Sequence, residues 1–203
     1  EQKENKTDRT PSVIYVGFKS NESDITNYPS NNTGVVAFGD SLVRGVGSTG
    51  GGFVKILSDE LNVSITNLGV SGNTTADALR RVKEVTNRKP ALTIILLGGN
   101  DFLSRIPAKD TIANLSSIIE RIHESGSAVL LIGLEASLPG ANKGEIFEEL
   151  AEKYNTAYVG DILDGIFGVQ KLMSDGLHPN DDGYKIMAER IKPTLKIYTT
   201  FKR

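Results

Sequence analysis

Short apolar runs alternate with segments of helical periodicity along most of this chain. The run Ala91–Leu97 is apolar at nearly every position, as expected of a strand that is buried on both faces of a parallel sheet. Further strands are predicted at residues 34–38, 63–68, 127–133 and 157–159. Helices are predicted at residues 52–61, 74–85, 110–125 and 143–154 and from about Asp181. This alternation predicts an α/β fold, a three-layer α/β/α sandwich around a parallel sheet of about five strands. Pro193 should end or kink the last helix.

The N-terminal residues do not follow this pattern. Residues 1–11 are nearly all polar, and the apolar island at 12–18 is followed by polar turn formers. We therefore expect a polar extension or tether at 1–33 and one domain at 34–203. A polar stretch is common after a removed signal or anchor segment. It favours an exported protein, in the periplasm, outside the cell or tethered to its surface, with a cytoplasmic protein as the alternative.

Composition excludes several functions. The net charge is −2 and no Lys/Arg run occurs, which gives no reason to expect nucleic acid or an anionic membrane as a partner. The absence of cysteine excludes disulfides, thiolate catalysis and Cys-ligated zinc. The two histidines, His123 and His178, are too few for a His-rich metal site, so we expect neither a metal nor another cofactor. No apolar run approaches the ~18 residues of a transmembrane helix.

Polar residues gather where the predicted strands end. Gly39–Leu42 follows the first strand, Gly69–Asn73 the second and Gly98–Asp101 the third, while Asp175–Pro179 precedes the last helix. Sites in open parallel sheets lie beyond the carboxyl ends of the strands. We therefore expect these four segments to converge on one edge of the sheet.

Ser41 is the predicted nucleophile. A serine hydroxyl needs a base to remove its proton, and a neutral imidazole suits that task near pH 7. His178 is the better candidate because its loop is constrained by Gly176 and Pro179. Asp175 precedes His178 by three residues, so its carboxylate can reach the imidazole and hold its tautomer.

An oxyanion hole can be assembled from three donors. These are the backbone N–H groups of Ser41 and Gly72 and the side-chain amide of Asn100. Asp40 and Asp101 are predicted to shape their turns by accepting hydrogen bonds. His123 lies near the end of a predicted helix, where a solvated cation suits the helix dipole.

Two competing motifs are rejected. Gly39-x-Ser41-x-Val43 lacks the second glycine of the Gly-x-Ser-x-Gly elbow. Residues 45–50 match Gly-x-Gly-x-x-Gly but begin well after the strand, and no ribose-binding acid follows the second strand. We therefore predict that 45–52 is a pliable active-site loop and not a dinucleotide site.

Together the four segments resemble the SGNH hydrolases, also called the GDSL esterase/lipase family. The matching residues are Gly39, Asp40, Ser41, Leu42, Gly45, Gly72, Gly98, Gly99, Asn100, Asp101, Asp175, His178 and Pro179. The resemblance covers about 34–195 and is greatest for the bacterial arylesterases, acyl-CoA thioesterases and lysophospholipases. It implies a flavodoxin-like sandwich, with Ser41 as nucleophile, His178 as base and Asp175 as its partner. The implied oxyanion hole is again Ser41, Gly72 and Asn100.

We therefore predict a serine hydrolase that cleaves carboxylic ester or thioester bonds of small or lipid-like acyl substrates through an acyl-serine intermediate. Phe102 and Leu103 come two and three residues after Asn100 and, with Leu138 from the loop 135–143, are predicted to line the cleft. A carbohydrate O-acetyl esterase is the alternative within the family. A non-catalytic binding module on the same fold is the alternative outside the enzymes. The expected partner is a small-molecule substrate, and the sequence leaves the oligomeric state open.

Overall fold

Five parallel strands form one sheet in the order β2-β1-β3-β4-β5 in a computed structural model that describes residues 25–134 and 144–199. The strands are β1 (Val35–Gly39), β2 (Ile65–Gly69), β3 (Leu92–Leu96), β4 (Ala128–Ile132) and β5 (Ala157–Val159). This is the flavodoxin-like strand order, and it confirms the predicted fold class.

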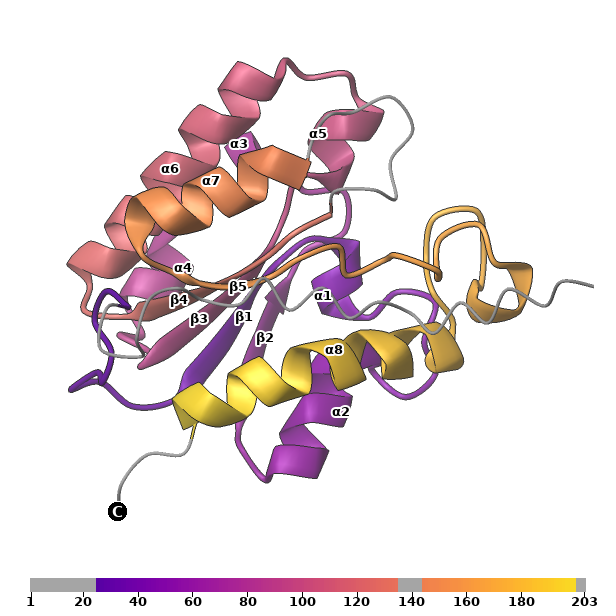
Figure 1. The fold of residues 1–203 in the computed structure, drawn as a ribbon, viewed down its shortest axis with the longest axis horizontal. Coiled ribbons are helices and arrows are strands. Elements are labelled where there is room, and N and C mark those ends of the chain that lie inside the picture. The colour runs from indigo at the N-terminus through magenta and orange to yellow at the C-terminus, as the bar shows by residue number, and fades with distance from the viewer. Residues whose placement is uncertain (1–24, 135–143, 200–203) are drawn as a thin grey trace, which may run out of the picture.

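Helices cover both faces of the sheet (Figure 1). One face carries α2 (Gly52–Leu61) and α8 (Asp181–Thr199), and the other carries α3 (Thr75–Arg80), α4 (Lys83–Thr86), α6 (Ala108–Glu124) and α7 (Gly144–Tyr154). Two short helices, α1 (Ser41–Arg44) and α5 (Gly99–Leu103), follow β1 and β3 directly, and a 3-10 turn, η2 (Gln170–Leu172), precedes α8. The functional segments therefore leave the sheet at one edge.

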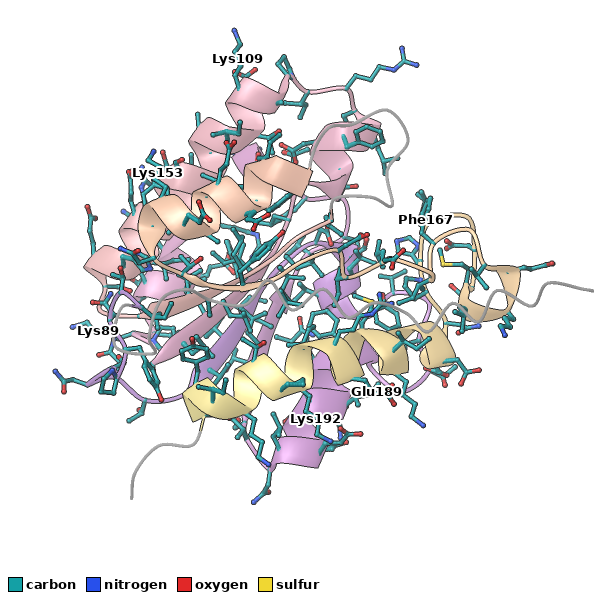
Figure 2. All side chains as sticks on the ribbon, viewed as in Figure 1. Lys89, Lys109, Lys153, Phe167, Glu189 and Lys192 are labelled. Atoms are coloured by element: carbon teal, nitrogen blue, oxygen red, sulfur yellow. The ribbon has the colours of Figure 1, made fainter. Side chains whose placement is uncertain are left out.

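The core lies between the sheet and its two helix layers, where side chains fill the interior (Figure 2). The three central strands, β1, β3 and β4, are buried at every position, as their apolar runs predict. Helix α6 contributes Leu115, Ile118, Ile119 and Ile122 from one layer. Each such side chain stabilises the fold by about 1.5–3 kcal/mol when it is fully buried. At the surface, Lys192 of α8 and Glu60 of α2 form an ion pair of 2.8 Å.

Two helices differ from their predicted extents. The segment predicted as one helix at 74–85 is divided into α3 and α4, which are separated by Arg81 and Val82. Pro193 was predicted to end or kink this helix, and of these two outcomes the ending is wrong, because α8 continues through Pro193 to Thr199. Beyond the proline it buries Thr194, Leu195 and Tyr198, and this packing stabilises a helix that one missing N–H would otherwise weaken.

Residues 25–33 pack against the domain. Ile25 is part of the hydrophobic core, and the Asn27 side chain donates to the carbonyl oxygens of His123 (2.7 Å) and Ser127 (3.2 Å). The predicted tether is therefore in contact with the domain from Ile25 on. Residues 1–24 lie outside the described part of the chain, and their role as a tether stays a prediction.

His123 is not a solvated surface cation. Its ring is half-buried, and its Nε2 has no hydrogen-bond partner among residues 25–134 and 144–199. Burial lowers the pKa of His123 to about 4, so the ring is neutral near pH 7. No helix in the same two ranges is long and apolar enough to span a membrane.

Candidate active site

Ser41 is the first residue of α1, directly beyond the end of β1. The turn is made by Asp40, whose Oδ1 accepts a hydrogen bond of 2.9 Å from the Leu42 N–H at the helix start. A side chain at Gly39 has no room, because a Cβ there would lie 2.3 Å from both the Leu96 carbonyl oxygen and Val43 Cγ2. The strand therefore ends in a tight turn that presents the serine at the sheet edge.

The structure brings Ser41, His178 and Asp175 together as predicted. His178 Nε2 lies 3.0 Å from Ser41 Oγ, and His178 Nδ1 lies 2.8 Å from Asp175 Oδ2. An ionised carboxylate only accepts hydrogen bonds, so Nδ1 carries the proton and Nε2 is left to accept from the serine. This is the arrangement that a Ser–His–Asp triad requires.

Asp175 is held by its own loop. Its Oδ1 accepts the N–H groups of Leu177 and His178, both at 2.7 Å. The hydrogen bond from the His178 ring, with those two N–H donors, lowers the pKa of Asp175 to about 2. Its side chain is 54% exposed, against 19% for His178. The carboxylate is therefore ionised at neutral pH, and its exposure to water also favours the charged form.

The predicted oxyanion donors lie at the start of α1 (Ser41), in the loop after β2 (Gly72) and in α5 (Asn100). Asn100, in α5, donates its Nδ2 protons to the Asn73 carbonyl oxygen at 3.0 Å and to Asp40 Oδ2 at 3.3 Å. Gly72 is exposed at φ +79°, with open space where a Cβ would lie. Because Asn100 already uses both amide protons, it can donate to an oxyanion only by releasing one of them, and the longer bond to Asp40 is the weaker.

The two neighbouring acids are buried and shape this region, as expected. Burial is the main cause that raises the pKa of Asp40 to about 6. Asp101 accepts from the Thr75 N–H (2.8 Å) and the Thr75 hydroxyl (2.5 Å), which ties α5 to the start of α3. The Thr111 hydroxyl donates to the same carboxylate at 3.3 Å.

Arg81 is a site residue that sequence reasoning missed. Its Nη2 donates to the Gly39 carbonyl oxygen at 2.8 Å and its Nε to Asn73 Oδ1 at 2.6 Å. The guanidinium also lies 4.4 Å from the centroid of the Phe38 ring. Arg81 thus joins the end of β1 to the loop after β2. The only signal in the sequence was a polar residue within an apolar helical stripe.

The structure describes two of the three residues that are predicted to line the cleft. Phe102 is half-buried and Leu103 is 50% exposed, both in α5. Leu138 lies outside the described residues. Two further exposed apolar residues, Val70 and Leu177, lie on the loops that carry Gly72 and His178. No group of three or more His, Asp or Glu residues in the described ranges could hold a metal ion.

Comparison with known proteins gives a consistent set of relatives. The model of the GDSL-like lipase/acylhydrolase family matches residues 37–186. Esterase TesA of Pseudomonas aeruginosa is 33% identical, covering 80% of this chain and 87% of the relative. The thioesterase 1/protease 1/lysophospholipase L1 of Escherichia coli is 26% identical, covering 80% and 83%. A crystal structure of TesA superposes with a TM-score of 0.76 at 31% identity, covering 82% of this chain and 99% of that one.

Proposed function

Because the chain belongs to the GDSL-like lipase/acylhydrolase family, we propose that it works through a triad of Ser41, His178 and Asp175. The predicted reaction class is confirmed by this family and these relatives: the protein is a serine hydrolase that cleaves carboxylic ester or thioester bonds. The observation that carries the residue assignment is the 3.0 Å contact between Ser41 Oγ and His178 Nε2, backed by Asp175.

In the proposed reaction, His178 Nε2 takes the hydroxyl proton while Ser41 Oγ attacks the acyl carbonyl carbon. The resulting oxyanion accepts from the N–H groups of Ser41 and Gly72 and from Asn100, which releases Asp40 to do so. The imidazolium then protonates the leaving alcohol or thiol, and the acyl-serine forms. A water molecule, deprotonated by His178, cleaves that ester and restores the free serine, while Asp175 stabilises the imidazolium in both steps.

The proposed substrates are small or lipid-like acyl esters and thioesters. Phe102 and Leu103 come two and three residues after the oxyanion donor Asn100 in α5, which supports a role in contacting the acyl group, and a bulky Phe102 favours short or aryl acyl groups. Nothing in the described part of the site favours the carbohydrate O-acetyl esterase. Export to the periplasm or cell surface rests on the polar residues 1–11 alone, and fractionation of producing cells tests it.

The assignment is tested by labelling with a fluorophosphonate and by hydrolysis of p-nitrophenyl acetate. The wild type and the Ser64→Ala variant, which changes an exposed serine at the start of β2, should be labelled and active. Ser41→Ala should be neither, with an unchanged thermal midpoint. Turnover by a folded Ser41→Ala variant would remove Ser41 from the mechanism.

A further inference from the structure

The glycine-rich loop 45–52 has no part in the proposed chemistry, yet it starts at the nucleophile. The N–H groups of Gly45 and Val46 both donate to the Ser41 carbonyl oxygen at 3.0 Å. The loop then runs to Gly52, the first residue of α2. The position of this loop is therefore linked to the position of Ser41 through two backbone hydrogen bonds.

The loop is bound to the start of α8 chiefly by one carboxylate, that of Asp181. Asp181 accepts from the Ser48 hydroxyl (2.5 Å), the Thr49 hydroxyl (2.6 Å), the Thr49 N–H (2.9 Å) and the Gly50 N–H (3.2 Å). Tyr184, one helical turn later, donates its hydroxyl proton to the Val46 carbonyl oxygen at 2.8 Å. We call this set of bonds the Asp181 contact.

The same loop lies directly against the segment that carries His178. A Cβ at Gly47 would lie 2.3 Å from Ser174 Oγ, 2.5 Å from the Pro179 carbonyl oxygen and 3.1 Å from His178 Cβ. Gly47 also has φ +90°, a conformation that favours glycine. The absence of a side chain there lets the two backbones approach closely.

Residues 174–177, which precede His178, are exposed, and the segment is otherwise held by local bonds. His178 O accepts from the Ser174 N–H at 2.9 Å, and Leu172 O accepts from the Asn180 N–H at 2.9 Å. These bonds shape the segment but do not set its distance from α1. Asp181 lies three residues after His178. Its hydrogen bonds to loop 45–52 therefore connect the segment that carries His178 to the segment that follows Ser41.

We propose that Asp181 is a positioning residue, which holds His178 at hydrogen-bonding distance from Ser41 by binding loop 45–52 to the start of α8. This rests on the proposed function of Ser41 and His178. A misplacement of about 1 Å between reacting groups can lower a rate by about 10²-fold, so a contact that sets this distance acts on kcat. The four hydrogen bonds, led by that from Ser48, lower the pKa of Asp181 to about 2, so the acceptor is ionised throughout the neutral range.

The test compares Asp181→Asn with Asp182→Asn. Both remove one negative charge from the first turn of α8, where carboxylates interact favourably with the helix dipole, but only Asp181 contacts the loop. The rate of fluorophosphonate labelling and kcat for p-nitrophenyl acetate should both fall about tenfold in Asp181→Asn, with little change in KM. Asp182→Asn should match the wild type.

A second variant acts from the other side of the contact without changing any charge. Thr49→Val removes the hydroxyl donor and keeps the shape of the side chain, so it should lower the labelling rate by a smaller factor in the same direction. Hydrogen exchange at the Thr49 and Gly50 amides should accelerate in Asp181→Asn, which reports the loosened loop independently of activity.

The results separate failure of this inference from failure of the proposed function. Loss of labelling in Ser41→Ala together with wild-type labelling in Asp181→Asn would overturn the positioning role and leave the triad intact. An equal loss in Asp181→Asn and Asp182→Asn would assign the effect to charge and also overturn it. Full activity in Ser41→Ala would overturn the proposed function itself.

Discussion

Asp40 and Asp175 each lie within three residues of a reacting side chain, yet they are in opposite environments. Asp40, next to Ser41, is 2% exposed, and burial raises its pKa to about 6. Asp175, three residues before His178, is 54% exposed, and hydrogen bonds lower its pKa to about 2. The nucleophile half of the site is thus preformed by the core, while the base half is preformed by local bonds in an exposed loop.

Because of this difference, substitutions in the two halves of the site are expected to have different effects on folding and on the catalytic rate. Around Ser41, the buried groups Gly39, Asp40 and Asp101 hold the ends of strands and the starts of helices, so a change there affects folding as well as rate. Around His178, the side chain of Asp175 supports little except the imidazole and its own loop. A change there is expected to affect the rate almost alone.

The largest expected effect belongs to the exposed aspartate. Asp175→Asn places an NH₂ group or a weaker acceptor opposite His178 Nδ1, which disturbs the tautomer in which Nε2 accepts from Ser41. We expect kcat to fall by about 10²–10⁴-fold, with a nearly unchanged thermal midpoint. Steady-state kinetics and calorimetry check this, with the exposed Asp164→Asn as a control. A folded Asp175→Asn enzyme with wild-type kcat would break the comparison.

An intermediate effect is expected on the buried side. Arg81→Met keeps an apolar stem near Phe38 but removes the donors to the Gly39 carbonyl oxygen and Asn73. The variant should lose about 1–3 kcal/mol of stability, because buried acceptors lose their partners, and about tenfold in kcat. Arg80→Met is the matched control, since Arg80 is exposed and pairs with Asp77 in its own helix. Equal behaviour of the two variants in urea unfolding and kinetics would contradict a role for Arg81.

The smallest expected effect is a difference between the wild type and Asp40→Asn in how the free energy of unfolding depends on pH. Burial raises the pKa of Asp40 to about 6 in the folded protein, against 3.8 for an ordinary aspartate in the unfolded chain, so the folded state binds more protons between these values. Its contribution to stability is present at low pH and is lost as the pH rises through about 6. From pH 7 to pH 5 the wild type should gain about 1 kcal/mol of unfolding free energy relative to Asp40→Asn.

The contribution of Asp175 to stability has the opposite pH dependence. Because the pKa of Asp175 is lowered, its contribution is lost only as the pH falls towards about 2. Urea unfolding of the wild type and Asp40→Asn at both pH values measures the difference. Parallel pH profiles for the two proteins would show that Asp40 does not titrate in this range.

The fold and the arrangement of Ser41, His178 and Asp175 could be predicted because both depend on local pattern. Apolar runs mark the buried strands, and parallel strands bring residues at their carboxyl ends to one edge. That is sufficient to bring Ser41 and Asn100 close together, and the Asp175–His178 spacing supplies the rest. The prediction that Asn100 supplies a side-chain amide donor did not foresee that both protons of this amide already form hydrogen bonds.

Other features could not be predicted because they depend on contacts between distant segments. The bonds from Thr49 and Ser48 to Asp181 span 132 and 133 residues, and no periodicity marks such pairs. His123 was expected at the surface because a solvated cation suits the end of a helix. The segment 25–33 packs against that end of α6, where the Asn27 side chain donates to the His123 carbonyl oxygen. Nothing in the sequence around His123 indicates this contact.

Ser41 and His178 are 137 positions apart in the chain, and in the proposed mechanism this separation also determines when the enzyme acquires activity during its synthesis. Chains emerge from the ribosome N-terminus first, so Ser41 and the donors at Gly72 and Asn100 are made long before the base. Until residue 178 and the helix that follows it are in place, the serine hydroxyl has no partner to remove its proton. An incomplete chain that ends before this point is therefore an inert product, unable to hydrolyse acyl esters in the cell that makes it.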